Sequence, residues 1–134
     1  MLNLAATAVF AIAFAVPAFG NDTSIIFRGK CTVFVEGLVA ADVHSFELNG
    51  STGPLFQLFE INVSGISPAK LSVDMADYGQ GLEVNFVLAY NNGGDDVKSG
   101  EAVLLNPVAG NHLRGTFPLG SGRNSVVCNG SVTQ

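Results

Sequence analysis

Leu82-Glu83-Val84-Asn85-Phe86-Val87-Leu88-Ala89-Tyr90 is the stretch that decides the fold class of this chain. A large apolar side chain stands at every second position of it, and this period of two is typical of a β-strand with one buried face. The same alternation recurs over residues 42–48 and 70–76. After Gly20 no window of a dozen residues shows the spacing of three and four that indicates an amphipathic helix. The sequence therefore predicts an all-β protein.

Turn-forming sequences separate the strand patterns at short intervals. Glycine, asparagine and proline gather in them, as at residues 49–54 and 91–96, and supply the backbone conformations that turns require. Eight or nine short strands predict a small antiparallel β-sandwich with an immunoglobulin-like Greek key, or alternatively a flattened barrel. The strand at 55–63 has apolar residues on both faces, so Phe56 and Leu58 are expected to be covered. The nine predicted strands lie at residues 24–27, 31–36, 42–48, 55–63, 70–76, 82–90, 101–105, 112–117 and 125–132.

Residues 1–20 have the composition of a secretory signal peptide. Their apolar run at 4–19 has no charge and is short for a membrane span, which needs about 20 residues. Small residues at Ala18 and Gly20 predict cleavage after Gly20. An uncleaved N-terminal anchor stays open, because no Lys or Arg precedes the apolar run. Residues 21–134 are then one β-sandwich domain without a further membrane span, secreted to the exterior or, in a bacterium, to the periplasm.

Two cysteines, Cys31 and Cys128, lie near the two ends of the mature chain. In an exported protein an even pair predicts a disulfide, with two buried free thiols as the alternative. The bridge requires the first substantial strand and the last strand to lie close together. We expect it to fasten an edge of the sandwich, where strands would otherwise fray.

Asn-x-Ser/Thr sequences mark potential N-glycosylation sites. Asn-Gly-Ser, which occurs at 49–51 and 129–131, is also common turn chemistry, so the sequences do not decide between a eukaryotic and a bacterial source. The four predicted acceptors are Asn21, Asn49, Asn62 and Asn129.

The charge of the chain excludes nucleic acid as a partner and leaves a basic protein open. Lys and Arg number 6 and Asp and Glu number 11 among 134 residues, for a formal net charge of −5. So few basic residues, spread along the chain, exclude the basic surface that nucleic acid requires. Residues 31–69 carry acidic side chains and no Lys or Arg, which is compatible with a basic protein partner, with a solvated acidic face as the alternative.

Catalytic and metal-binding motifs are missing from the sequence. The histidines His44 and His112 stand in separate strand patterns, without a Gly-x-Ser-x-Gly motif, and the cysteines are used by the disulfide. The carboxylate pairs Glu47 with Glu60 and Asp74 with Glu83 have no spacing that fixes their separation. We therefore predict no catalytic residue, no resident metal and no cofactor. A calcium loop remains a candidate at residues Asn91, Asp95 and Asp96.

The predicted function is that of a secreted, non-catalytic binding or surface-structural domain, with another protein as the expected partner. The first alternative is an inhibitor that binds a basic secreted enzyme, and the second is a small secreted hydrolase. Carbohydrate stays open as a ligand, although Trp is absent and the only candidates for stacking on a sugar are Tyr78 and Tyr90.

Overall fold

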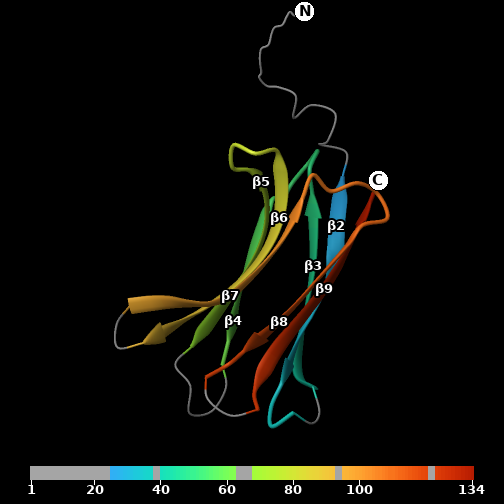
Figure 1. Ribbon diagram of the computed structural model, residues 1–134. Coiled ribbons are helices and arrows are strands. Elements are labelled where there is room, and N and C mark those ends of the chain that lie inside the picture. Colours follow the sequence, from blue (N-terminus) through green and yellow to red (C-terminus); the bar gives the residue numbers. More distant parts are fainter. Residues whose placement is uncertain (1–24, 38–39, 63–67, 93–94, 121–122) are drawn as a thin grey trace, which may run out of the picture.

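The computed structural model describes residues 25–37, 40–62, 68–92, 95–120 and 123–134 (Figure 1). The predicted signal peptide at residues 1–20 and the sequon at Asn21 lie outside the described residues. No helix occurs in these ranges, and so none that is long and apolar enough to cross a membrane.

In the part of the chain that the structure describes, eight antiparallel β-strands form two sheets of four strands that face each other (Figure 1). One sheet has the order β3-β2-β9-β8 and the other the order β4-β5-β6-β7. The all-β class and the sandwich of two antiparallel sheets are therefore confirmed. The strands are β2 (Ile26–Phe34), β3 (Ala40–Asn49), β4 (Phe56–Ile61), β5 (Ala69–Asp77), β6 (Leu82–Asn92), β7 (Asp95–Leu105), β8 (His112–Pro118) and β9 (Ser125–Thr133).

The connectivity is up-and-down. Within each sheet, strands that follow each other in the chain lie side by side, and the last strand, β9, pairs with β2, the first strand among the described residues. The chain passes from one sheet to the other between β3 and β4 and between β7 and β8, and each of these pairs is also in contact. The strand order is an up-and-down meander and not the predicted Greek key, because strands that follow each other in the chain are also neighbours in space.

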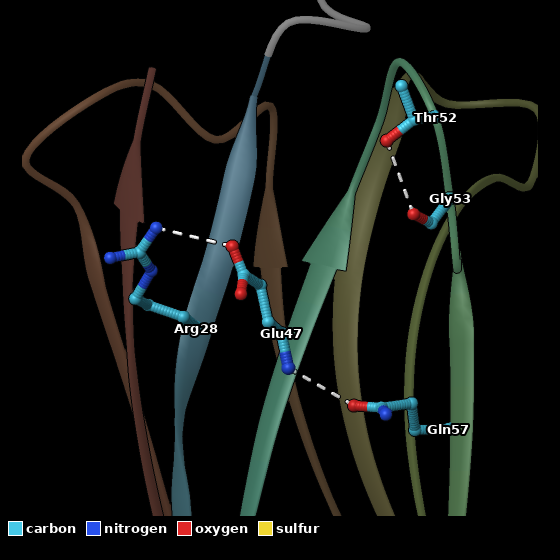
Figure 2. Close-up of polar contacts among 5 residues, drawn as sticks. All are labelled: Arg28, Glu47, Thr52, Gly53 and Gln57. Atoms are coloured by element: carbon cyan, nitrogen blue, oxygen red, sulfur yellow. Dashed lines mark hydrogen bonds and ion pairs between the residues drawn. The ribbon is translucent and has the colours of Figure 1, made fainter.

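Side chains help to close the two seams between the sheets. At the β3–β4 seam the backbone N–H of Glu47 donates to Oε1 of Gln57 (3.1 Å; Figure 2). In the turn between these strands the hydroxyl of Thr52 donates to the carbonyl of Gly53 (3.3 Å; Figure 2). At the β7–β8 seam the hydroxyl of Ser99 donates to the carbonyl of Pro118 (3.0 Å).

The core lies between the sheets and is built from alternate residues of the strands. The sequence pattern of β6 is confirmed, since its apolar row is buried apart from the partly buried Tyr90. Phe86 of β6 contacts Phe27 and Phe46 of the opposite sheet, with ring centroids 5.7 and 5.6 Å away. These three rings join the sheets at the centre of the core. Other fully buried large side chains are Leu48, Leu71, Met75, Leu88, Leu119, Val33, Val73, Val84, Val126 and Val132.

Glycine at position 130 is required by this aromatic cluster. Gly130 stands opposite Gly29 in the β2–β9 ladder, and a Cβ added to it would overlap the ring of Phe27. The ring therefore packs directly on the backbone of β9. Because Gly29 is paired in this way, β2 runs unbroken from Ile26 to Phe34, where two separate strands were predicted.

The predicted disulfide is confirmed, but its predicted location is wrong. Cys31 and Cys128 stand directly opposite each other in the β2–β9 ladder, with Cα atoms 4.0 Å apart, and both are fully buried. β2 and β9 are the two central strands of their sheet. The bridge therefore joins the first and last strands in mid-sheet rather than at an edge, because pairing of the chain ends closes the up-and-down order.

The expectation that both faces of β4 are covered is also wrong. Phe56 and Leu58 are 55% and 54% exposed, whereas Phe59 packs against the core and Ile61 is buried. The inward residues of β4 alternate with the outward ones, so one face of this strand meets the core and the other meets solvent. Two apolar side chains thus remain on the outer surface.

Candidate functional site

The outer face of the β4-β5-β6-β7 sheet gathers exposed apolar side chains at its two margins. Four of the nine large hydrophobic residues that are strongly exposed among the described residues lie here, on the two outermost strands. We call these side chains the apolar rim. They are Phe56 and Leu58 of β4, and Val103 and Leu105 of β7.

An acidic pocket lies between the two halves of the apolar rim. The strand register forms one row across the sheet, in which Asp74 and Asn85 stand side by side in the middle. The pocket has a volume of about 290 Å³. The complete row is Phe56, Asp74, Asn85 and Val103. The residues that line the pocket are Ser72, Asp74, Tyr78, Glu83, Asn85, Val87 and Glu101.

Asn85 is the buried polar side chain of this pocket, with 5% of its surface exposed. Its Nδ2 donates to Oδ1 of Asp74 (3.0 Å). An ionised carboxylate can only accept, so this contact fixes the orientation of the Asn85 amide. Oδ1 of Asn85 then has no hydrogen-bond partner among the described residues. A buried acceptor without a donor costs about 1–3 kcal/mol, and a donor supplied by a ligand would recover it.

Tyr78 borders the pocket from the turn that follows β5. Its hydroxyl donates to Oδ2 of Asp74. This hydrogen bond, with partial burial and the negative charges of Asp74 and Glu83 as lesser causes, raises the pKa of Tyr78 to about 12. The phenol therefore stays protonated at physiological pH, and both oxygens of Asp74 accept hydrogen bonds from within the pocket.

The titration of Tyr78 tests this geometry. Tyr78 is expected to ionise near pH 12, and Asp74→Asn is expected to move that pKa toward the ordinary value of about 10. Because the pKa is raised by folding, this contribution to stability is complete below pH 10 and is lost as the pH rises toward 12. Tyrosinate absorbance in a Tyr90→Phe background reports Tyr78 alone. An unchanged pKa in Asp74→Asn would contradict the contact.

Glu83 and Glu101 add two more carboxylates to the pocket. Glu101 accepts from Nζ of Lys98 (2.9 Å), so its charge is balanced locally. Among the described residues no group of three His, Cys, Asp or Glu is placed to hold a metal ion together. The pocket thus presents hydrogen-bond acceptors and negative charge.

The residues predicted for calcium do not form an open loop. Asn91 pairs with Asp96 across the β6–β7 hairpin, and Asn92 pairs with Asp95. The predicted loop at 91–96 is thus mostly strand, since β6 extends to Asn92 and β7 begins at Asp95. Calcium binding there stays a prediction.

Three predicted glycosylation sites fall within the described residues. Oδ1 of Asn49 accepts from the backbone N–H groups of Ser51 and Thr52 (2.9 and 3.1 Å), which is turn chemistry. Asn62 is exposed after β4, and Asn129 is exposed on β9, where its Oδ1 accepts from Arg114 (3.2 Å). Glycosylation at these positions stays a prediction.

The two histidines do not form a common site. His44 lies on β3 and His112 on β8, the two outer strands of one sheet, with β2 and β9 between them. His44 shares the inward face of its strand with buried Phe46 and packs against Phe59, at a centroid distance of 5.0 Å. His112 is exposed on the outer face and contacts Ser131 (3.0 Å).

A second groove lies on the outer face of the other sheet. Its volume is about 560 Å³, and it is lined by Arg28, Lys30, Ser45, Glu47, Asn129 and Ser131 with intervening backbone. Arg28 and Glu47 form an exposed ion pair across it (3.2 Å; Figure 2). Two of the charged side chains that line the groove are therefore paired with each other.

Comparisons with known proteins give no relative for this chain. No protein-family model matches it, and neither a curated protein nor a solved structure is significantly similar to it. The function must therefore be argued from the site. Of the carboxylate pairs considered from sequence, Asp74 and Glu83 do line one pocket, whereas the roles of Tyr78 and Asn85 in it had been missed.

Proposed function

We propose that this protein is an exported, non-catalytic binding domain that docks another protein on the outer face of the β4-β5-β6-β7 sheet. The observation that carries the proposal is the apolar rim, which leaves four large hydrophobic side chains in solvent around one acidic pocket. Exposed apolar groups gathered on one face mark interaction surfaces in soluble proteins. A partner with apolar side chains around a basic group is complementary to this face.

Export is the part of the proposal that the disulfide supports. Disulfides persist in oxidising compartments, and the Cys31–Cys128 bridge is compatible with an extracellular or periplasmic protein. The predicted signal peptide at residues 1–20 belongs to the same proposal. An enzyme inhibitor is a special case of it, with a basic secreted enzyme as the partner that the acidic pocket would contact.

The hydrogen bonds that Asp74 accepts favour a binding function over hydrolysis. A glycoside hydrolase needs one carboxyl group free to give a proton and a second free to attack or to activate water. Both oxygens of Asp74 instead accept hydrogen bonds from Tyr78 and Asn85. This carboxylate therefore serves to orient its neighbours and to supply negative charge.

The test compares capture of a partner by matched variants. Leu58→Ser combined with Val103→Ser removes both sides of the apolar rim, and Val108→Ser makes the same kind of change at a 59% exposed position outside the sheet. We expect a protein from the native medium to be retained by the wild type and by Val108→Ser, and about tenfold less by the rim variant.

Two outcomes would overturn the proposal. Equal retention by the rim variant and the control would show that the face is not the docking surface. A concentration-dependent dimer of the purified protein, dissociated by the rim substitutions in sedimentation experiments, would assign the face to a second copy of the chain instead.

A further inference from the structure

On the basis of the proposed docking face, we infer that the acidic pocket accepts the guanidinium group of an arginine side chain of the partner. The pocket offers acceptors and few free donors. The hydroxyl of Tyr78 and the Nδ2 of Asn85 both donate to Asp74. Oδ1 of Asn85, which is buried and has no partner among the described residues, and the carboxylate of Glu83 remain as the acceptors of the pocket that a ligand could satisfy. A ligand that satisfies them must bring several donors and positive charge.

The buried amide of Asn85 separates this pocket from an ordinary acidic surface. Exposed carboxylates are solvated whether or not a ligand binds, but Oδ1 of Asn85 is buried and without a partner among the described residues. A ligand donor that reaches this atom replaces no strong contact. The unpartnered Oδ1 of Asn85 would therefore gain a hydrogen bond from a ligand donor. This is the second feature of the pocket, besides its negative charge, that points to a cation with N–H groups.

Arginine fits the pocket better than lysine does. Guanidinium is planar and carries five N–H donors in fixed directions, whereas ammonium is a compact, strongly hydrated point charge. Planar donors can contact Asn85 and Glu83 together, and the 59% exposed ring of Tyr78 provides a surface on which guanidinium stacks. A volume of about 290 Å³ holds such a group with part of its aliphatic stem.

The row across the sheet also predicts the sequence around the arginine. Neighbouring strands lie about 4.8 Å apart, so Phe56 and Val103 each lie about 7 Å from the midpoint between Asp74 and Asn85. In an extended peptide, side chains two residues apart point the same way and are separated by about 6.7 Å. A segment crossing the strands with arginine in the pocket therefore places the residues two before and two after it on the rim. The preferred partner segment is apolar-x-Arg-x-apolar.

Short peptides test the inference without the native partner. The probe is acetyl-Leu-Ser-Arg-Ser-Leu-amide, compared with peptides in which lysine or citrulline replaces arginine. Citrulline retains the shape of arginine and removes its charge. Titrations followed by NMR are expected to show saturable binding of the arginine peptide, about tenfold weaker binding of the citrulline peptide, and intermediate binding of the lysine peptide.

Glu83→Gln is the matched variant in the pocket, and Glu47→Gln is its control on the opposite sheet. Glu83→Gln is expected to weaken binding of the arginine peptide about fivefold or more, and Glu47→Gln is expected to leave this binding unchanged. Circular dichroism confirms that both variants fold. Equal binding of the arginine and citrulline peptides, or no saturable binding up to about 10 mM, would overturn the inference. If the rim variant still loses its native partner in that case, the proposed docking function stands and the arginine anchor does not.

Discussion

Replacement of Phe86 by alanine is expected to lower the free energy of unfolding by about 3–5 kcal/mol. Phe86 is fully buried and is the residue of the β4-β5-β6-β7 sheet that contacts Phe27 and Phe46 of the other sheet. Truncation removes both the burial of one ring and the aromatic contacts that join the sheets. A loss of this size is a large part of the total stability of a small domain, about 5–15 kcal/mol.

Chemical denaturation followed by circular dichroism measures this effect. The matched control is Phe56→Ala, the same change at a side chain that is 55% exposed, for which a loss below about 1 kcal/mol is expected. If Phe86→Ala proves too unstable to purify, Phe86→Leu keeps the comparison quantitative, with an expected loss of about 1–3 kcal/mol. Equal losses at positions 86 and 56 would contradict the described core.

Removal of the disulfide is expected to cost a similar amount. The bridge joins residues separated by 97 positions, and the chain-entropy model assigns about 4–5 kcal/mol to a loop of that length. The variant is Cys31→Ala combined with Cys128→Ala, since both sulfurs are fully buried and alanine introduces no unpaired polar group. The denaturation midpoint of the variant should fall well below that of the oxidised protein.

The position of the disulfide predicts which strands lose stability when it is removed. β2 and β9 are central in their sheet, so hydrogen exchange should rise across β3, β2, β9 and β8 together rather than at an edge strand. Reductant should lower the midpoint of the wild type and leave that of the double variant unchanged. A wild-type midpoint insensitive to complete reduction would contradict a stabilising role of the bridge.

Several features of the fold follow from local sequence. The alternation at residues 82–90 correctly predicts which face of β6 is buried, because side chains of a strand point to opposite sides whatever the neighbouring strand is. The same rule applies to residues 42–48 and 70–76. The turn sequences locate most strand ends, but the interruption predicted between residues 27 and 31 is wrong, since the pairing of Gly29 with Gly130 joins positions about a hundred residues apart in the chain.

Only some residues of the candidate site could be predicted from the sequence. Asp74 and Glu83 were noted as a pair of carboxylates, but no spacing connects either with Phe56 or Val103. The period-two pattern places Asn85 on the outer face of β6 but does not identify its neighbours on the adjacent strands. Its neighbours across β5 and β7 depend on the register of two ladders, which decides that Asp74 lies beside it.

The sequence by itself determined the all-β class and the inward face of most strands, because these depend on period-two patterning. It also predicted the Cys31–Cys128 disulfide, because two cysteines allow only one intramolecular pair. The tertiary structure alone decided the up-and-down strand order, the central position of the bridge and the acidic pocket within its apolar rim. The physical reason is that patterning specifies the face on which a side chain lies, whereas hydrogen-bonded register between strands distant in the chain specifies its neighbours.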